Sequence, residues 1–585
     1  MMKLLGIIIN LLKSLYSSLR RFPVSIILAI MTTIVMVFLV HVQNYPDNNI
    51  KDTLGRIAMI LALGFSISLC IKLMFERFSK ISPVLKASIY LAEAIVLTLY
   101  YFFLLKSFDM VPVSRYIALS IAVYLAFLFT PYFFRREGFE LYIIKLFTRF
   151  LTAVVYSVVL YLGIAAILFT VDKLLGVNIS EKLYLDVWVC VVGIFAPSFF
   201  LAGVPTLSEQ MDLTYFPKLF RVLLLYIVMP ILSIYTVILY IYFAKILITL
   251  QWPVGLVSHL VLWYSVIIAL VIFFISPLRD ENNWVRIFIT WLTKLILPLI
   301  LMMFISIVIR INAYGITENR YYVIVLGLWA FGIMIYLGFF KIRRNIVMLV
   351  TLSLIAALSV SGPWSSYSIS KFSQNKRFES ILLKNSMLKE GKIIKSVTEV
   401  PKDDKTEVSQ ILEYFSRSHT FNDIRYLPKD FKMDDIEKVF GFAYSYPDYS
   451  NINGMHFSYN SKPTGEAADI KGYEYFFDVK GYAPISTSLG SDLELKYDNE
   501  KHEMWIILNN KEIYRSSVSE FVKQLYKKYG STEKFEVLPE DMIVTDENEK
   551  AKVKIIFQNI NGTDEKEDGQ LQINSADFYV FLGLK

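Results

Sequence analysis

Hydrophobic residues fill most of the first 360 positions in long runs, and short polar connections separate one run from the next. Eleven runs are long enough to cross a bilayer, because a helix rises about 1.5 Å per residue and a span takes roughly 20 residues. The pattern therefore predicts an α-helical polytopic membrane bundle of about 11 transmembrane helices. The predicted spans are residues 23–42, 54–75, 84–105, 112–134, 150–171, 184–203, 220–248, 254–276, 287–310, 321–340 and 345–361.

The pattern differs at both ends of this bundle, which is expected to occupy residues 23–362. Residues 1–22 place lysines and apolar residues at helical spacing, as in an interfacial amphipathic helix that lies on the membrane. After the bundle the chain becomes charged and rich in amides, and residues 363–430 predict a helical connector. Residues 431–585 contain short aromatic and branched runs between turns, which predicts a C-terminal α+β soluble domain.

Individual elements can be placed in this last third of the chain. Helices are expected where apolar residues recur at helical spacing, and strands where aromatic and branched residues gather in short runs. The expected helices are residues 371–388, 405–418 and 516–529, the expected strands are 473–481, 493–498 and 504–509, and a final hairpin joins 552–560 to 570–584 through a turn at 561–569.

The charges follow the same division. The first 370 residues contain 29 basic and 15 acidic residues, whereas the remainder contains 30 basic and 36 acidic residues. The first part therefore has a net charge of +14 and the remainder −6, which sum to +8, and the positive excess lies in short connections beside apolar helices, where membrane topology explains it. We expect no nucleic-acid partner, and we expect the lipid bilayer to be the main environment of the first part.

The side on which each connection lies follows from its basic residues. Nineteen lysines and arginines fall on one side of the predicted bundle and nine on the other. Because basic residues concentrate on the cytoplasmic side, the side with nineteen is assigned to the cytoplasm, together with the N-terminus. An odd number of spans then places the C-terminal domain outside.

A short polar island, Arg310–Tyr322, separates the ninth predicted span from the tenth. Polar groups next to the bilayer core are costly unless they are paired or hydrated, so the island is a candidate site. A purely structural interpretation also explains every residue of the island. Gly315 would form a turn, and Thr317 or Asn319 would cap the next helix. Arg320 would either pair with Glu318 or reach headgroup phosphates. The candidate ligand- or partner-binding residues are Arg310, Tyr314, Gly315, Thr317, Glu318, Asn319, Arg320 and, after the last span, Trp364.

A second marked stretch, Ser361–Ser370, follows the last predicted span. Gly362 and Pro363 end the helix there, and Trp364 and Tyr367 are expected at the outer membrane interface. By topology this stretch and the polar island share one face of the bundle. We expect them to form together the surface on which the C-terminal part docks.

Charge inside the predicted spans is sparse. Glu93 lies in the middle of its span and is the best candidate for a functional carboxylate within the bilayer, although a partner on a neighbouring helix would explain it equally well. Pro230 and Pro298 interrupt the two longest spans. Each marks a structural kink or a break at a binding site.

Motifs with catalytic or metal-binding chemistry are lacking in the sequence. It has no H-E-x-x-H, G-x-S-x-G, Walker or C-x-x-C motif, and its histidines are scattered. Both cysteines, Cys70 and Cys190, lie inside apolar runs. We therefore expect no metal or other cofactor, and the catalytic residues of any reaction stay unknown.

The two marked stretches also carry a resemblance. Y-G-I-T-E-N-R-Y-Y from Tyr314, followed by G-P-W-S-S-Y-S-I-S-K-F-S-Q from Gly362, resembles a bacterial family of multi-pass membrane proteins known as domain of unknown function 4153. R-R-F-P from Arg20 and P-Y-F-F-R-R-E-G-F from Pro131 extend the similarity. The resemblance implies an integral protein of a bacterial plasma membrane, and it supplies no activity or catalytic residue.

Three functions are compatible with this pattern. The preferred one is an envelope interaction or sensory protein, which should expose an apolar or aromatic patch on its C-terminal domain. A transporter or flippase for an amphiphilic substrate should instead hold a cavity at the midplane that reaches Glu93, Pro230 or Pro298. A transferase acting on lipid-linked substrates should show an outward cleft in which Arg310 and Arg320 converge with Glu318.

Overall fold

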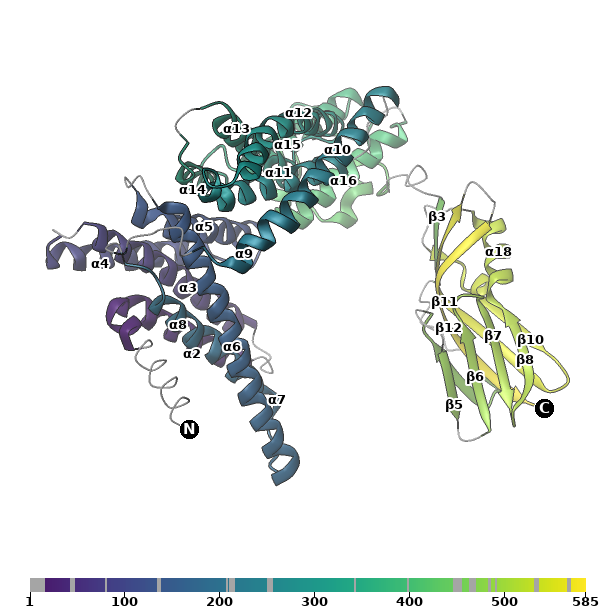
Figure 1. The fold of residues 1–585 in the computed structure, drawn as a ribbon. Coiled ribbons are helices and arrows are strands. Elements are labelled where there is room, and N and C mark those ends of the chain that lie inside the picture. Colours follow the sequence, from purple (N-terminus) through teal and green to yellow (C-terminus); the bar gives the residue numbers. More distant parts are fainter. Residues whose placement is uncertain are drawn as a thin grey trace. The chain divides into compact units, whose positions relative to one another are not determined.

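The chain folds into two compact units, Met1–Glu399 with Ile411–Gly441 and Val400–Gln410 with Phe442–Lys585. Figure 1 shows the helices of the first unit and the strands of the second. The computed structural model describes residues 16–42, 48–78, 81–133, 138–206, 209, 216–249, 256–340, 343–396, 399–445, 455–461, 470–481, 485–489, 492–530, 536–565 and 570–585. Residues 1–15 of the expected interfacial helix lie outside the described residues.

The first unit contains the membrane bundle. Ten of the helical stretches in the described residues are long and apolar enough to cross a bilayer. They are α2 (Pro23–Val42), α3 (Asn48–Arg77), α4 (Pro83–Phe103), α5 (Met110–Phe129) with η1 (Thr130–Tyr132), α6 (Phe139–Leu175), α7 (Glu181–Cys190) with η2 (Val191–Phe195) and α8 (Ala196–Ala202), α9 (Lys218–Val222) with η4 (Leu223–Val228) and α10 (Met229–Thr249), α11 (Leu256–Ile275) with η5 (Ser276–Leu278), α12 (Asn283–Tyr314) and α13 (Glu318–Phe339).

The eleventh predicted span corresponds to a shorter helix, α14 (Ile346–Leu358). Its 13 residues extend about 20 Å, which is less than the roughly 30 Å of a bilayer core. Its two ends nevertheless lie beside opposite ends of α13. The Arg344 amide donates to the Tyr336 hydroxyl near the end of α13, and the Tyr321 hydroxyl near its start donates to the Trp364 carbonyl beyond α14.

Two spans change locally from α to π geometry directly before a proline. Segment η2 precedes Pro197, and segment η4 precedes Pro230. Proline lacks an N–H and its ring clashes with the carbonyl four residues earlier, so the wider π turn relieves the clash. The span with Pro298 keeps α geometry throughout α12.

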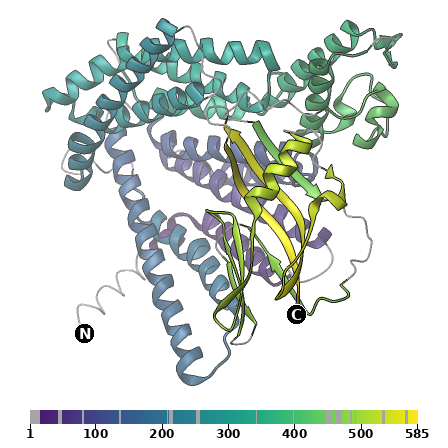
Figure 2. The same ribbon diagram turned by 90° about the vertical axis from the view of Figure 1, so that its right-hand side faces the viewer.

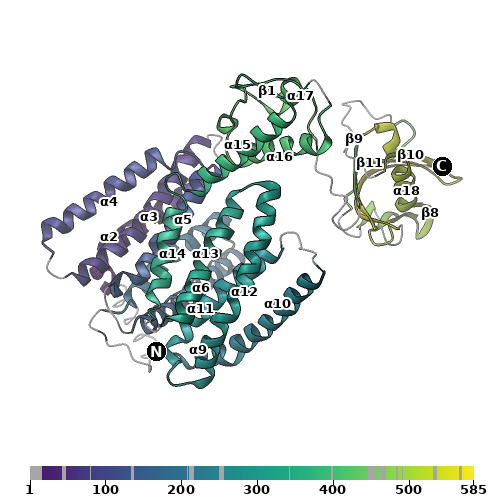
Figure 3. The same cartoon turned by 90° about the horizontal axis from the view of Figure 1, so that it is seen from above.

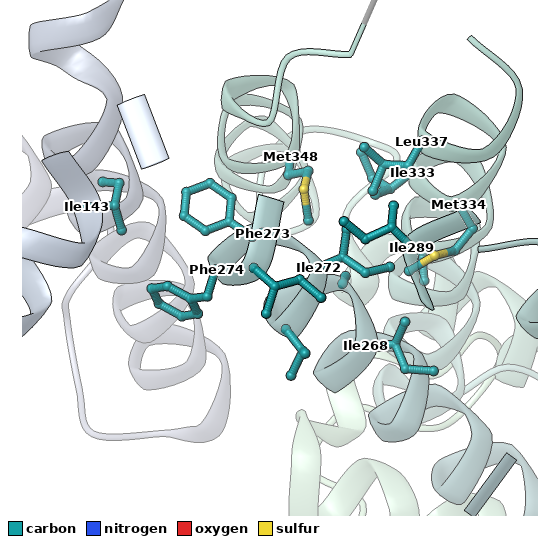
Figure 4. Close-up of a cluster of buried hydrophobic side chains, with 14 of the residues drawn as sticks. Ile143, Ile268, Ile272, Phe273, Phe274, Ile289, Ile333, Met334, Leu337 and Met348 are labelled. Atoms are coloured by element: carbon teal, nitrogen blue, oxygen red, sulfur yellow. The ribbon is translucent and has the colours of Figure 1, made fainter. Parts of the chain in front are cut away.

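The core of the bundle is assembled mainly from α11, α12 and α13, with contributions from α6 and α14. Figure 4 shows Ile272 of α11 among Ile289, Ile333 and Met334, with Met348 of α14 beside them. Most of these side chains are inaccessible to solvent. Seen from above, α11, α12, α13 and α14 lie side by side and α2, α3, α4 and α5 do likewise (Figure 3).

The connector, through those of its residues that belong to the first unit, packs at one end of this bundle, which we call the connector end. It contains α15 (Ser366–Lys384), β1 (Leu388–Lys389), β2 (Lys392–Ile393), α16 (Lys402–Ser418), η6 (Phe421–Asp423), η7 (Met433–Asp435) and α17 (Ile436–Phe440). The two predicted helices therefore form, and α15 begins five residues earlier than expected because Ser365 caps it by accepting a hydrogen bond from the Ser368 amide. Phe440 packs edge-on against both Phe378 and Phe431.

The second unit has two sheets that enclose one core together with α18 (Val518–Tyr529). The larger sheet has the order β4–β12–β11–β3–β9, with β10 also pairing with β11. Its strands are β3 (Met455–Ser461), β4 (Tyr475–Val479), β9 (Glu536–Val537), β10 (Ile543–Glu547), β11 (Ala551–Glu565) and β12 (Gln570–Leu584). The smaller sheet runs in order through β5 (Ile485–Leu489), β6 (Leu493–Asp498), β7 (Glu503–Leu508) and β8 (Lys511–Ser517). Figure 2 shows the long pair β11 and β12.

The predicted fold class is thus confirmed, with one correction in the last hairpin. The sequence predicts a turn at residues 561–569, but β11 continues to Glu565 and stays paired with β12 as far as Gln570, with register shifts at Phe557/Asn559 and Asn561/Gly562. Polar residues such as Asn561 and Thr563 occupy strand positions because this pairing satisfies the backbone along both strands. Local composition alone favoured a loop.

Candidate functional site

The polar island forms a tight turn between α12 and α13 against the connector. The chain reverses at Gly315, whose φ of 69° lies in the left-handed region. A Cβ at this position would lie 2.9 Å from Nε2 of Gln374 in α15. The backbone conformation therefore favours glycine, and an added Cβ would also force the end of the Gln374 side chain to shift.

Side chains from α15 satisfy the backbone of this turn. The amide of Ile316 donates to the Ser373 Oγ over 2.9 Å. The Gln374 Nε2 donates to the carbonyls of Tyr314 and Ile316 at 3.1 and 3.0 Å. Buried backbone groups are costly without partners, so these bonds hold α15 firmly to the island.

The first turn of α13 contacts the stretch that precedes α15. The Tyr321 hydroxyl donates to the Trp364 carbonyl over 2.8 Å, and the Tyr322 hydroxyl lies 3.1 Å from the Ser366 Oγ. The two marked stretches therefore lie side by side, as their predicted topology requires. Trp364 itself is 54% exposed.

Glu318 has partners that the sequence did not indicate. Its two carboxylate oxygens accept from the Tyr414 hydroxyl at 2.8 and 2.9 Å, and the His419 Nε2 lies 2.8 Å from Oε1. The His419 side chain is only 2% exposed. Burial and the Glu318 carboxylate raise the pKa of the Tyr414 hydroxyl, which therefore stays protonated as a donor. The suggested ion pair between Glu318 and Arg320 is not formed in the described structure.

Helix α15 also positions the segment that contains His419. The Asn375 Nδ2 donates to the Asp423 carbonyl over 2.9 Å, and its Oδ1 accepts from the Arg425 amide over 2.7 Å. The Lys371 Nζ lies 2.9 Å from the Asp423 Oδ1. Although burial acts to raise it, the hydrogen bond and charge of Lys371 keep the pKa of the Asp423 carboxyl below its ordinary value.

Three arginines gather on the other side of the island around Tyr314. The Arg320 Nη1 donates to the carbonyls of Tyr314 and Gly315 at 3.0 and 2.7 Å. The Arg377 Nη1 donates to the same Tyr314 carbonyl at 3.2 Å. Both guanidinium groups lie over the Tyr314 ring, 5.5 and 5.9 Å from its centre. Arg310 lies close enough to repel the charge of Arg320.

The remaining candidate residues have simpler surroundings. Thr317 occupies the N-cap position of α13, but its side chain makes no capping hydrogen bond. Asn319 is exposed. Glu93 is buried in α4, and its Oε1 has no hydrogen-bond partner within the described residues.

A pocket of about 540 Å³ opens at the connector end. It lies between the start of α5, the end of α14, the start of α15 and the end of α16. The side chains that line it include Arg115, Lys371, Arg417, His419, Asp109 and Asp423. Glu318, Arg310 and Arg320 do not line it, and Glu318 contacts the lining residue His419.

Three further pockets lie elsewhere in the bundle. An apolar groove of about 770 Å³ is bounded by α2, α6, α7 and η2. Pockets of about 360 and 400 Å³ lie beside Arg21 and Trp188. Glu93, Pro230 and Pro298 line none of the four.

The second unit presents aromatic side chains on the outer face of its larger sheet. Phe476 of β4 is 51% exposed, and its ring lies 5.2 and 5.3 Å from the rings of Tyr579 and Phe581 in β12. Tyr473 lies 6.2 Å from Phe581. We call Tyr473, Phe476, Tyr579 and Phe581 the aromatic face. Lys480 and Lys552 lie against it, over Tyr579 and Tyr473.

Sequence reasoning missed Tyr414, His419 and Arg377 as members of the site. Tyr414 and His419 are separated from Glu318 by 96 and 101 residues, so no local spacing joins them. His419 follows α16 directly, and Arg377 belongs to a charged helix that reads as solvated. Gln374 lies inside a quoted motif, and the motif was its only signal.

These features define a multi-pass membrane protein that has a C-terminal α+β domain. The chain belongs to the family described as "Domain of unknown function (DUF4153)", whose family model matches residues 23–391. The match covers the bundle, the polar island and α15, and it ends before Tyr414 and His419.

A relative of this chain is an uncharacterized protein, PM1469, of Pasteurella multocida (strain Pm70). The two are 24% identical over 238 residues, which are 40% of each chain. No solved structure matches the chain significantly.

Proposed function

We propose that this protein is an interaction or sensory protein of the bacterial envelope, anchored in the plasma membrane by its bundle. Its N-terminus lies in the cytoplasm, and its C-terminal domain lies outside, where the aromatic face binds another envelope protein. The aromatic face is the observation that carries the proposal, because solvent-facing strand positions ordinarily hold polar side chains.

The chemistry of the face favours a protein partner with an acidic rim. Aromatic side chains such as Phe476 and Tyr579 give large contact areas at little conformational cost, and they dominate the energetics of protein interfaces. Lys480 and Lys552 flank them. Because the C-terminal part is acidic overall, two lysines beside the aromatic rings mark this surface for a complementary acidic edge.

The bundle and connector support an anchoring role. The polar island is held by α15, and Glu318 is held by Tyr414 and His419. A transferase has weaker support, because the arginines contact Tyr314 while the Glu318 carboxylate faces the connector. These contacts hold the connector residues of the first unit to the end of the bundle.

Transport of an amphiphile is the second candidate. The groove of about 770 Å³ is lined by Leu19 near the start of α2 and by Asp186 near the start of α7, and these helix starts lie at opposite ends of the bundle under the predicted topology. Such a groove accommodates an apolar chain. A lipid-flipping assay with the purified protein in vesicles tests this role, and movement above that of protein-free vesicles would favour it over the first proposal.

The interaction proposal is tested by crosslinking in living cells. A photoreactive benzoylphenylalanine in place of Phe476 should give one discrete protein adduct, and the same group in place of the exposed Lys511 of β8 should give none. Combining it with Tyr579→Ser and Phe581→Ser should abolish the adduct. Equal adducts from both positions would contradict a specific face.

The outward placement is tested separately by cysteine labelling. A chain with Cys70→Ser, Cys190→Ser and Glu549→Cys carries a single thiol at an exposed position of the C-terminal domain. A membrane-impermeant maleimide should label it in intact cells. Labelling only after permeabilisation would place the domain in the cytoplasm and overturn the proposed topology.

A further inference from the structure

The turn around Tyr314 has more hydrogen-bond donors than acceptors. The Tyr314 carbonyl oxygen accepts from Arg320, Arg377 and Gln374, although a carbonyl has only two lone pairs. The Nε of Arg310 is buried and has no hydrogen-bond partner among the described residues. Guanidinium groups carry five donors each and no acceptor, so an acceptor-rich group beside Arg310 would pair the donor that the described residues leave unpaired.

The positive charges of these arginines also favour a bound anion. Arg310 and Arg377 both repel the charge of Arg320. Within the described part of the chain, neither Arg310 nor Arg320 forms an ion pair with a carboxylate. The nearest acid in the sequence, Glu318, is already occupied by Tyr414 and His419. Like charges that are gathered near a low-dielectric region without a counter-charge destabilise the folded state, and a bound anion removes this penalty.

The position of the cluster identifies the kind of anion. Arg310 lies in the last two turns of α12 and Arg320 in the first turn of α13, so both lie where spanning helices leave the bilayer. The exposed rings of Tyr314 and Trp364 belong to the same end of the bundle, and such aromatic residues concentrate at the depth of lipid headgroups. Arginine binds phosphate through two parallel N–H bonds.

We propose that Arg310, Arg320 and Arg377 form a binding site for a phosphate group, carried by an anionic phospholipid of the leaflet at the connector end. The phosphate oxygens accept the hydrogen bonds that the Tyr314 carbonyl cannot, and they neutralise the gathered charge. The lipid then fixes the junction of α12, α13 and α15. This inference does not depend on the aromatic face or on its partner.

The test uses the full-length protein in a neutral detergent and measures binding by titration. The probes are short-chain phosphatidylglycerol, short-chain diacylglycerol without phosphate, glycerol 3-phosphate and inorganic phosphate. We expect the protein to bind phosphatidylglycerol and to bind diacylglycerol at least tenfold more weakly. Binding should also weaken as salt is raised from 0.1 to 0.5 M, because the contact is ionic.

Two variants separate the site from general attraction to anionic lipid. Arg310→Gln with Arg320→Gln should weaken phosphatidylglycerol binding by about tenfold or more. Arg417→Gln removes one positive charge from the same end, but Arg417 is 78% exposed and pairs with Glu413, so binding should be unchanged. If the double Gln variant does not fold, Arg320→Lys keeps the charge and loses the bidentate geometry, and it should give a smaller loss.

The binding results distinguish a specific lipid site from general attraction to anionic lipid and from a site for free phosphate. Phosphatidylglycerol binding that survives in the double variant, or that falls equally in Arg417→Gln, would overturn the site. Inorganic phosphate binding as tightly as phosphatidylglycerol would assign the site to free phosphate and reject the lipid source. A failure here leaves crosslinking at Phe476 unaffected, so the two proposals fail separately.

Discussion

Polar groups on the two sides of the polar island need hydrogen-bond partners, and the two sides differ in how far the chain itself supplies them. On the Glu318 side, a buried carboxylate meets a hydroxyl and an imidazole from the connector, and its acceptor capacity is used by the chain itself. On the Arg320 side, the guanidinium groups of Arg320 and Arg377 share one carbonyl, and the charges of Arg377 and Arg310 both repel that of Arg320. A polar cluster that is satisfied from within holds a fold together, whereas a cluster with surplus donors is prepared for a ligand.

The largest effect is expected on the Glu318 side. Glu318→Ala removes the buried carboxylate that contacts both the Tyr414 hydroxyl and the His419 ring and leaves these two groups only each other, 3.0 Å apart, so it should lower the free energy of unfolding by about 3–5 kcal/mol. Glu318→Gln keeps one acceptor oxygen and should cost less. Thermal unfolding and limited proteolysis of the connector measure both. A Glu318→Ala variant as stable as the wild type would remove the basis of the comparison.

The turn between the two sides should show the next effect. Gly315→Ala forces an alanine into the left-handed region and brings its Cβ to 2.9 Å from the Gln374 Nε2, so we expect a loss of about 1–3 kcal/mol. Gly332→Ala in the exposed face of α13 is the matched control, because nothing lies within 4 Å of its added Cβ. Alanine favours a helix interior, so the control should be neutral or slightly stabilising in the same unfolding measurement.

The polar island and the bundle could be predicted from the sequence, whereas the partners of Glu318 could not. The island, its turn at Gly315 and its neighbour around Trp364 were predicted because polar residues stand out against apolar runs. The bundle was predicted for the same reason, and only α14 was ambiguous, since its 13 residues fall below the length of a span. Apolar runs determine where membrane helices lie, so this part of the fold is written locally in the sequence.

The partners on the Glu318 side were beyond local reasoning. Tyr414 and His419 come from a helix end about 100 residues away, and contacts over such separations depend on tertiary packing. Strands β3, β5, β8, β9 and β10 were missed for a related reason, because sequences such as I-S-T-S-L in β5 carry little hydrophobic alternation. Their pairing with neighbouring strands, rather than their own composition, stabilises them.

The ion pair between Lys371 and Asp423 should give a smaller, pH-dependent effect. The pKa of Asp423 is lowered in the folded chain, so the pair contributes its full stability above the ordinary value of 3.8 and loses it as the pH falls through the lower folded value. Both side chains are about one-third exposed, which limits the contribution to below about 1 kcal/mol. Comparing the unfolding of wild type and Asp423→Asn should show a constant difference from pH 8 to 5 that shrinks below pH 4. A difference that grows on acidification would contradict this assignment.

The smallest effect should have the opposite sign and lies on the Arg320 side. In lipid-free detergent, Arg310→Gln removes one of three repelling charges and breaks no ion pair within the described residues, so it should leave stability unchanged or raise it by up to about 0.5 kcal/mol. Added phosphatidylglycerol should stabilise the wild type, because a ligand that binds only the folded state shifts the unfolding equilibrium, and it should stabilise Arg310→Gln less. Thermal unfolding with and without lipid measures both differences, with Arg417→Gln as the charge-matched control. If Arg310→Gln were destabilising in the absence of lipid, Arg310 would be satisfied within the fold, and the two sides of the island would not differ in kind.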